Sequence, residues 1–105
     1  MVQLPDRINK TINKYLQILE RNNISIKEAI LFGSYATGHN QKWSDIDIAL
    51  VSDLFTGDVI DDKDKIRSIT LSVSSKLEVM PFMSSDFNLQ NPFAKEILKT
   101  GIRLV

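Results

Sequence analysis

The sequence contains no cysteine, only one histidine and no long apolar run. Disulfides, thiolate zinc sites and cysteine nucleophiles are therefore excluded, and a cluster of histidine metal ligands cannot form. No apolar stretch approaches the roughly 20 residues that cross a bilayer, and the N-terminal residues lack the apolar core of a signal peptide. These absences favour a cytoplasmic protein without a membrane partner.

The length and charge of the chain narrow the class of protein further. A chain of 105 residues predicts one domain, residues 1–105, because chains divide into two domains only well above that size. The formal net charge is zero, but residues 28–64 hold eight acidic and two basic side chains. No basic run alternates with aromatic residues, so nucleic acid is not expected as a partner. The acidic middle favours cation binding, or it is a solvated loop over Asp58–Asp64.

Apolar periodicity predicts an α/β (α+β) protein in which helices flank one small mixed sheet. Apolar residues recur at helical spacing over residues 6–22, whereas residues 27–32 and 46–52 form short apolar runs typical of strands. The later elements are a helix capped by Asp61-Asp62, a strand over 76–82 ended by Pro81, a helix opened by Asn91-Pro92, and an edge strand within 102–105.

A glycine-serine pair follows the first predicted strand. Gly33 and Gly38 have the glycine spacing of a P-loop, but His39 and Asn40 follow instead of the required lysine and hydroxyl residue. A strand ending at Gly33 and a short helix starting at Ser34 would still direct backbone N–H groups at an anion. The alternative is a simple turn in which Ser34 caps the helix.

Two aspartates lie where the second strand begins. Residues i and i+2 of a strand point to the same face, so Asp45 and Asp47 are expected to project together. Paired carboxylates repel each other unless a cation, a proton or hydrogen-bond donors compensate, and their hard oxygen atoms suit Mg²⁺ or Mn²⁺. The alternative is that Asp45 belongs to a turn and Asp47 is a solvent-facing edge residue.

Glu78 is the candidate third acid. It lies in the predicted strand over 76–82, with Leu77 and Val79 on the opposite face. If that strand pairs beside residues 45–51, Glu78 joins the two aspartates. Three carboxylates beside a phosphate-binding turn would form a two-metal phosphoryl-transfer site; the alternative is an exposed strand residue.

The combined pattern, Gly33-Ser34 followed after ten residues by Asp45-Ile46-Asp47, resembles the signature of the nucleotidyltransferase superfamily that includes DNA polymerase beta. The small size and the stretch from Gly33 to Ile48 are similar to its minimal nucleotidyltransferase (MNT) branch. The resemblance implies the nucleotidyltransferase fold, ATP or another NTP as substrate, and two Mg²⁺ ions, with Mn²⁺ as a substitute. It assigns Gly33 and Ser34 to the nucleotide phosphates, and Asp45, Asp47 and Glu78 to metal binding and catalysis.

Many MNT proteins resemble antitoxins that are paired with a HEPN-domain toxin, and some transfer AMP to a toxin tyrosine. The resemblance therefore implies transfer of a nucleoside monophosphate, with AMP expected, to a hydroxyl of a partner protein. Two positions depart from many relatives: Glu78 stands where they have aspartate, and Thr37 where they have a basic residue. These departures motivate a second hypothesis, a non-catalytic antitoxin that neutralises its partner by forming a complex. The sequence leaves self-association open.

Overall fold

The computed structural model describes residues 4–105, which form a four-stranded mixed sheet in the order β3-β2-β1-β4. β1 (Glu28–Phe32) pairs antiparallel with both β2 (Ile46–Val51) and β4 (Ile102–Arg103). β2 pairs parallel with β3 (Leu77–Phe82). The expected mixed sheet flanked by helices is therefore confirmed, and so are the edge strand in the C-terminal tail and the pairing of strand 76–82 beside the aspartate strand.

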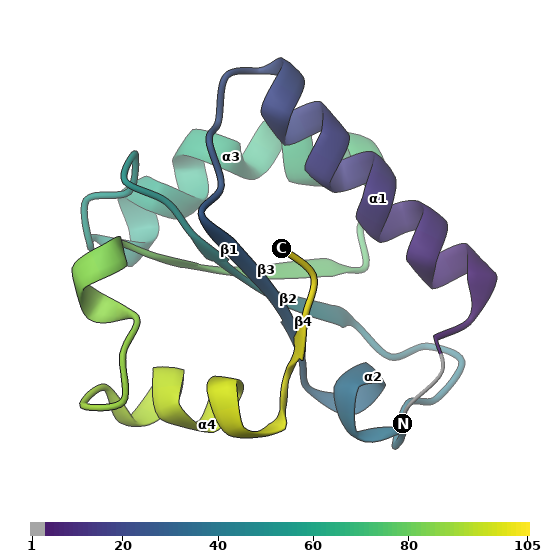
Figure 1. The fold of residues 1–105 in the computed structure, drawn as a ribbon. Coiled ribbons are helices and arrows are strands. Elements are labelled where there is room, and N and C mark those ends of the chain that lie inside the picture. The colour runs from purple at the N-terminus through teal and green to yellow at the C-terminus, as the bar shows by residue number, and fades with distance from the viewer. Residues whose placement is uncertain (1–3) are drawn as a thin grey trace.

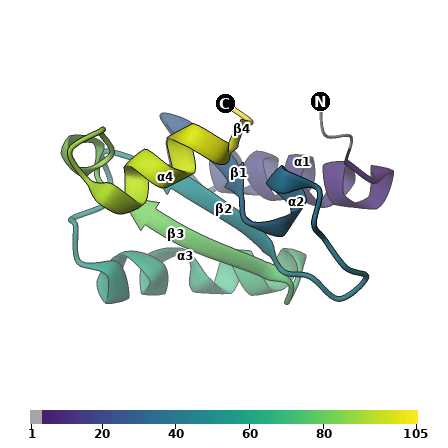
Figure 2. The same ribbon diagram turned by 90° about the horizontal axis from the view of Figure 1, so that it is seen from below.

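The helices lie on both faces of this sheet. α1 (Asp6–Arg21) and α3 (Val59–Val73) cover one face, and α4 (Pro92–Thr100) packs on the other (Figures 1 and 2). α2 (Ser34–Thr37) is a single turn that follows β1, and η1 (Ser84–Asp86) is a short 3-10 turn between β3 and α4. The open end of the α4 face, beside α2, is where the acidic residues of β2 and β3 lie.

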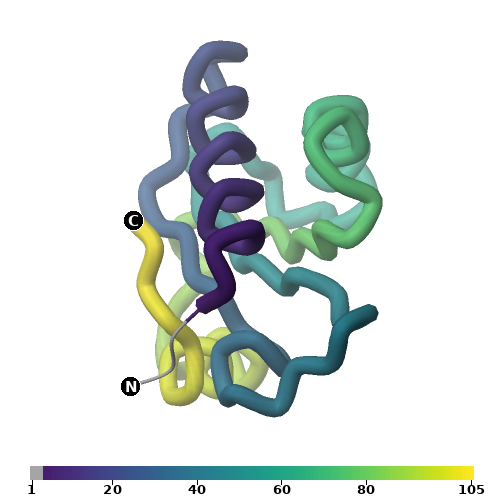
Figure 3. The backbone as a smooth tube through the Cα atoms, turned by 90° about the vertical axis from the view of Figure 1, so that its right-hand side faces the viewer, coloured from purple at the N-terminus to yellow at the C-terminus, as the bar shows by residue number. Residues whose placement is uncertain are grey.

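The sequence of α1 explains why it packs beside α3. Its buried residues recur every three or four positions and form one stripe: Ile8, Ile12, Tyr15 and Leu19. Tyr15 also hydrogen-bonds the hydroxyl of Thr70 on α3, with an O···O distance of 2.7 Å. Burial raises the pKa of Tyr15 to about 12, although the bond to Thr70 partly offsets that effect. The two helices thus form one layer (Figure 3).

The alternation of side chains along β2 divides the interior into two cores. Ile46, Ile48 and Leu50 pack against α1 and α3, whereas Ala49 and Val51 face α4. Asp47 lies two and four positions before Ala49 and Val51, so its side chain points to the α4 face as theirs do. The aspartate is therefore tolerated within a buried strand because it lies at the end of the face that α4 covers.

Two sequence-based expectations for α3 are wrong. The helix begins at Val59, and its N-cap is Asp58, whose carboxylate accepts hydrogen bonds from the backbone N–H groups of Ile60 and Asp61. Asp61-Asp62 therefore lie inside the first turn and are not the cap. Residues 58–64 are also not a solvated loop, because most are helical and Asp62 is only 1% exposed.

Asp62 is buried because it binds the segment that precedes α3. Its carboxylate accepts hydrogen bonds from the backbone N–H groups of Thr56 and Gly57, at 2.9 and 3.0 Å, and from the Thr56 hydroxyl. Sequence periodicity cannot reveal this role, because it depends on how the loop folds back onto the helix. Asp62 thus fixes the connection between β2 and α3.

Pro81 does not end the third strand, which continues to Phe82. Proline is tolerated there because β3 is an outer strand of the sheet and needs no outward N–H group at that position. Within residues 4–105, no helix combines the length and apolar composition required to cross a membrane.

Candidate functional site

Strand register places Asp47 and Glu78 side by side. Asp47 lies directly opposite Glu78 in the parallel β2–β3 pair and opposite Phe32 in the antiparallel β1–β2 pair. Directly paired residues share a face of a sheet, so Phe32, Asp47 and Glu78 form one row on the α4 face. Leu77 and Val79 are buried on the other face, as expected. The row brings together acids that are separated by thirty residues of sequence.

Gly33 follows Phe32 and lies against the carboxylate of Asp47. Its backbone has φ 74° and ψ −153°, a conformation that is essentially restricted to glycine. A Cβ atom at position 33 would overlap Oδ2 of Asp47. Both the backbone conformation and the close approach therefore require glycine, and the turn that was expected to bind phosphate lies directly beside the candidate metal ligands.

Ser34 is the first residue of α2 and is partly exposed at this turn. The carbonyl of Gly33 accepts backbone hydrogen bonds from Ala36 and Thr37, which closes the turn. Tyr35 and Ala36 are buried, and Gly38 ends the turn in the left-handed conformation. The short helix is thus held by its buried side chains, with Ser34 at the end that faces Gly33.

Asp45 immediately precedes β2 and is exposed. The loop that leads to it is held at two points: Ser44 Oγ accepts a hydrogen bond from the Gln41 backbone at 2.7 Å, and Lys76 Nζ donates to the Lys42 carbonyl at 3.2 Å. At the start of the ladder, the Ile46 N–H donates to the Lys76 carbonyl at 2.8 Å. These bonds position Asp45 beside the beginning of β3.

The three acids interact electrostatically. The pKa of the Asp47 carboxyl is raised, first because of its burial and then by the negative charges of Asp45 and Glu78. A divalent cation would compensate this repulsion, and carboxylate oxygens are the ligands that Mg²⁺ and Mn²⁺ prefer. The chemistry of the donor set therefore fits a divalent metal held by Asp45, Asp47 and Glu78.

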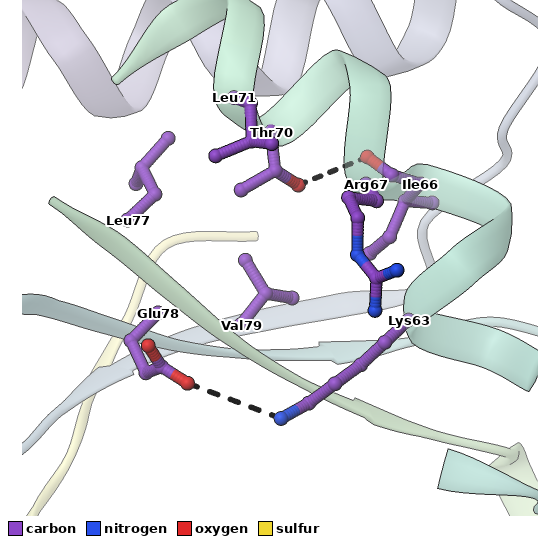
Figure 4. A pocket seen from close by; sticks show the side chains of 8 residues that line it. All are labelled: Lys63, Ile66, Arg67, Thr70, Leu71, Leu77, Glu78 and Val79. Atoms are coloured by element: carbon purple, nitrogen blue, oxygen red, sulfur yellow. Dashed lines mark hydrogen bonds and ion pairs between the residues drawn. The ribbon is translucent and has the colours of Figure 1, made fainter. Parts of the chain in front are cut away.

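Glu78 nevertheless has another partner. Its carboxylate lies 3.9 Å from Nζ of Lys63 on α3, across the outer edge of β3 (Figure 4). Among residues 4–105, no three side chains of the Asp, Glu, His and Cys types are already gathered closely enough to enclose a metal ion. Glu78 must therefore turn from Lys63 toward Asp47 to complete a three-carboxylate site.

Sequence reasoning missed Lys63 as a neighbour of the acidic residues. Lys63 and Glu78 are on different elements, and no local pattern connects them. His39 is an exposed loop residue whose Nδ1 lies 3.1 Å from the Thr37 hydroxyl. Trp43 is 75% exposed, whereas Tyr35 is fully buried.

Comparisons with known proteins support the same fold. A family model described as a nucleotidyltransferase domain matches residues 12–104. The fold is similar to that of a predicted nucleotidyltransferase from Sulfolobus solfataricus, with a TM-score of 0.69 and 18% identity over 92% of this chain and 78% of the other. It is also similar to a solved toxin-antitoxin structure with AMP-PNP, with a TM-score of 0.60 and 24% identity over 88% of this chain and 71% of the other.

No curated protein matches the sequence. The two solved structures are less than 25% identical to this chain, so they establish the fold and not the reaction. The family model covers nearly the whole chain, including the glycine-serine turn, both aspartates and Glu78. The chain therefore belongs to the nucleotidyltransferase domain family.

Proposed function

We propose that this protein is a metal-dependent nucleotidyltransferase whose site is formed by Gly33, Ser34, Asp45, Asp47 and Glu78. The observation that carries the proposal is the position of Asp47, which lies opposite Glu78 in the sheet and against a turn that only glycine can form. Membership of the family supports a nucleotidyl-transfer role. Nucleotidyltransferases generally use an NTP and divalent metal ions.

Each residue has a distinct role in this proposal. The backbone at Gly33 and the Ser34 hydroxyl bind the phosphates, since the absence of a side chain at Gly33 allows close approach. Asp45, Asp47 and Glu78 hold two Mg²⁺ ions, or Mn²⁺. When bound, these ions neutralise charge on the attacking and leaving oxygens. Asp47 is the central ligand because it lies between Gly33 and Glu78.

We further propose that the nucleotide is ATP and that the acceptor is a hydroxyl group of a partner protein, a HEPN-domain toxin. In that setting the chain acts as the antitoxin of an MNT/HEPN pair. The proposal is supported by the likeness to the solved toxin-antitoxin structure with AMP-PNP. Transfer of AMP would modify the partner covalently and release pyrophosphate.

The nucleotide part of the proposal is tested without a partner. Calorimetry measures the binding of AMP-PNP with Mg²⁺, and the fluorescence of Trp43 provides a second signal because the residue is exposed two positions before Asp45. The wild type is expected to bind, and the double variant Asp45→Asn/Asp47→Asn to lose binding at least tenfold. Asp86→Asn, an exposed aspartate outside the site, is the control. Equal binding by the double variant would refute the assignment.

The transfer itself is tested with α-labelled ATP, Mg²⁺ and a HEPN-like protein encoded by a neighbouring gene. Label is expected on the partner with the wild type, and none with the folded double variant. Label that persists after both aspartates are changed would exclude this site as the catalytic centre.

A second candidate function is a non-catalytic antitoxin that neutralises its partner by complex formation. The ion pair between Glu78 and Lys63 favours this alternative, because it engages the third carboxylate away from a metal site. Full neutralisation by the double variant, without Mg²⁺ or ATP, is its expected outcome. If neutralisation requires both aspartates and ATP, the catalytic function is retained.

A further inference from the structure

A groove lies along the outer edge of β3. β3 is an end strand of the sheet that residues 4–105 form, and α3 runs beside it. The groove has a volume of about 250 Å³, with Ile66 and the 61% exposed Leu71 contributed by α3, and Leu77 and Val79 by β3 (Figure 4). Glu78 lines the same groove, which is therefore continuous with the row of acidic residues.

The backbone of β3 is available on this edge over a short stretch. Hydrogen bonds at the two ends of the β2–β3 ladder, Ile46 N–H to Lys76 O and Ser52 N–H to Phe82 O, involve even-numbered residues of the 76–82 segment. In a parallel ladder, every second residue of a strand forms its backbone hydrogen bonds with the same neighbouring strand. Because the even-numbered residues bond β2, the backbone N–H and C=O groups of Leu77 and Val79 point away from β2. Pro81 lacks an N–H group and limits pairing beyond Val79.

A strand added at this edge would continue the row of acidic residues. Neighbouring strands lie about 4.8 Å apart, and directly opposed residues share a face. A residue opposite Glu78 would therefore point toward the face that carries Glu78 and Asp47. The residues before and after it would point into the apolar groove between Leu71 and Val79.

The charges of the groove indicate the chemistry of its occupant. Lys63 and Arg67 line it, and Glu78 is its acidic residue. Lys63 pairs with Glu78 at 3.9 Å, and Arg67 pairs with Asp64 at 2.7 Å. When Glu78 turns to a metal ion, Lys63 loses its partner. An acidic side chain beside the groove can then replace that partner.

We propose that this groove binds an extended segment of the acceptor protein as an added strand along Leu77–Val79. The segment has the pattern apolar–hydroxyl–apolar with an acidic flank, and its hydroxyl residue lies opposite Glu78. Addition of a strand to an exposed sheet edge is an established mode of peptide recognition, in which alternate side chains provide specificity. The inference rests on the proposed function, because it assigns the acceptor position of that same site.

At this position AMP passes from ATP to the hydroxyl group of the acceptor. The acceptor oxygen forms a bond with the α-phosphorus of ATP, and the bond from that phosphorus to the bridging oxygen breaks. Pyrophosphate leaves with the electron pair of the broken bond. The hydroxyl proton passes to solvent water. The products are the adenylylated segment and pyrophosphate.

Binding is tested by nuclear magnetic resonance with two synthetic peptides of the same composition. The probe is Asp-Ser-Val-Tyr-Val-Ser-Asp, and the control is Val-Val-Asp-Tyr-Ser-Asp-Ser, in which the alternation is broken. In the presence of Mg²⁺, addition of the probe at millimolar concentration is expected to shift the amide signals of Leu77 and Val79 and to slow their exchange with solvent. Shifts elsewhere, equal effects of both peptides, or no shift would overturn the proposal.

A matched pair of variants then tests whether binding of the probe depends on the groove or on exposed apolar residues elsewhere. Leu71→Ser removes an exposed apolar side chain of the groove, and Leu89→Ser removes one that is 67% exposed outside it. The first is expected to weaken probe binding at least fivefold and the second to leave it unchanged. Equal effects of the two substitutions would contradict the proposal.

In a last experiment, the protein is incubated with the probe peptide, α-labelled ATP and Mg²⁺, and label on the peptide is measured. Label on its tyrosine that is reduced at least fivefold by Leu71→Ser supports both proposals. Binding at Leu77–Val79 without any label leaves the groove assignment intact and contradicts the proposed transfer. Label that does not depend on Leu71 or on the alternation supports the transfer and overturns the groove assignment.

Discussion

Gly33 lies so close to Asp47 that no side chain fits between the turn and the carboxylate. The two residues come from adjacent strands, because Phe32 at the end of β1 is paired with Asp47 on β2. This contact couples the predicted phosphate-binding turn to the predicted metal ligand.

Gly33→Ala is expected to destabilise the fold by about 1–3 kcal/mol and to abolish nucleotide binding. The backbone at position 33 has a conformation that L-residues rarely adopt, and the new Cβ would collide with Asp47. Thermal or urea unfolding measures the first effect, and calorimetry with AMP-PNP and Mg²⁺ the second. Gly38→Ala is the control: it also introduces alanine at positive φ, but outside the contact with Asp47. Equal loss of nucleotide binding in both variants would contradict the special role of Gly33.

Asp47→Asn is expected to stabilise the metal-free protein at pH 7. The pKa of Asp47 is raised in the folded state by burial and by Asp45 and Glu78, so ionisation opposes folding as the pH rises through that pKa. Below the ordinary value of 3.8 the carboxyl is protonated in both states, and the difference between variant and wild type should vanish. Urea unfolding in EDTA at several pH values measures this; a variant less stable than the wild type at pH 7 would refute it.

Asp62→Ala is expected to lower the free energy of unfolding by about 3 kcal/mol. The substitution leaves the backbone N–H groups of Thr56 and Gly57 without their acceptor at a partly buried site. Asp61→Ala removes an exposed carboxylate from the same helical turn and should cost less than about 1 kcal/mol. Urea unfolding of both variants measures the difference. Similar losses would show that Asp62 acts only through the charge of the helix end.

Lys63→Gln is expected to increase the affinity for Mg²⁺ by about two- to fivefold, because an exposed ion pair contributes only a few tenths to one kcal/mol. The ammonium group of Lys63 competes with the metal for Glu78 across 3.9 Å. Titration of Mg²⁺ followed by Trp43 fluorescence measures the change. Lys95→Gln, an exposed lysine on α4, is the control and should leave the affinity unchanged. A lower affinity in Lys63→Gln would mean that Lys63 helps to orient Glu78.

The local pattern of the chain predicted most of the secondary structure. The stripe from Ile8 to Leu19 indicated α1, and the apolar runs before Gly33 and after Asp45 indicated β1 and β2. These predictions are confirmed because the periodicity of apolar side chains indicates which face of an element is buried. The start of α3 was missed because Asp58, Asp61 and Asp62 are all suitable caps. Only the fold of the preceding loop selects Asp58 as the cap and buries Asp62.

The order of residues along the chain predicts that a glycine-serine turn precedes a strand that begins at two aspartates, and that a further acid lies on a later strand. Packing between the elements makes β3 pair parallel with β2, so that Glu78 stands opposite Asp47, and it brings Lys63 to Glu78 around the edge of the sheet. Spacing along one element is set by the geometry of helices and strands, whereas contacts between elements depend on packing. The sequence could therefore name the acidic residues, but only the fold could place Glu78 opposite Asp47.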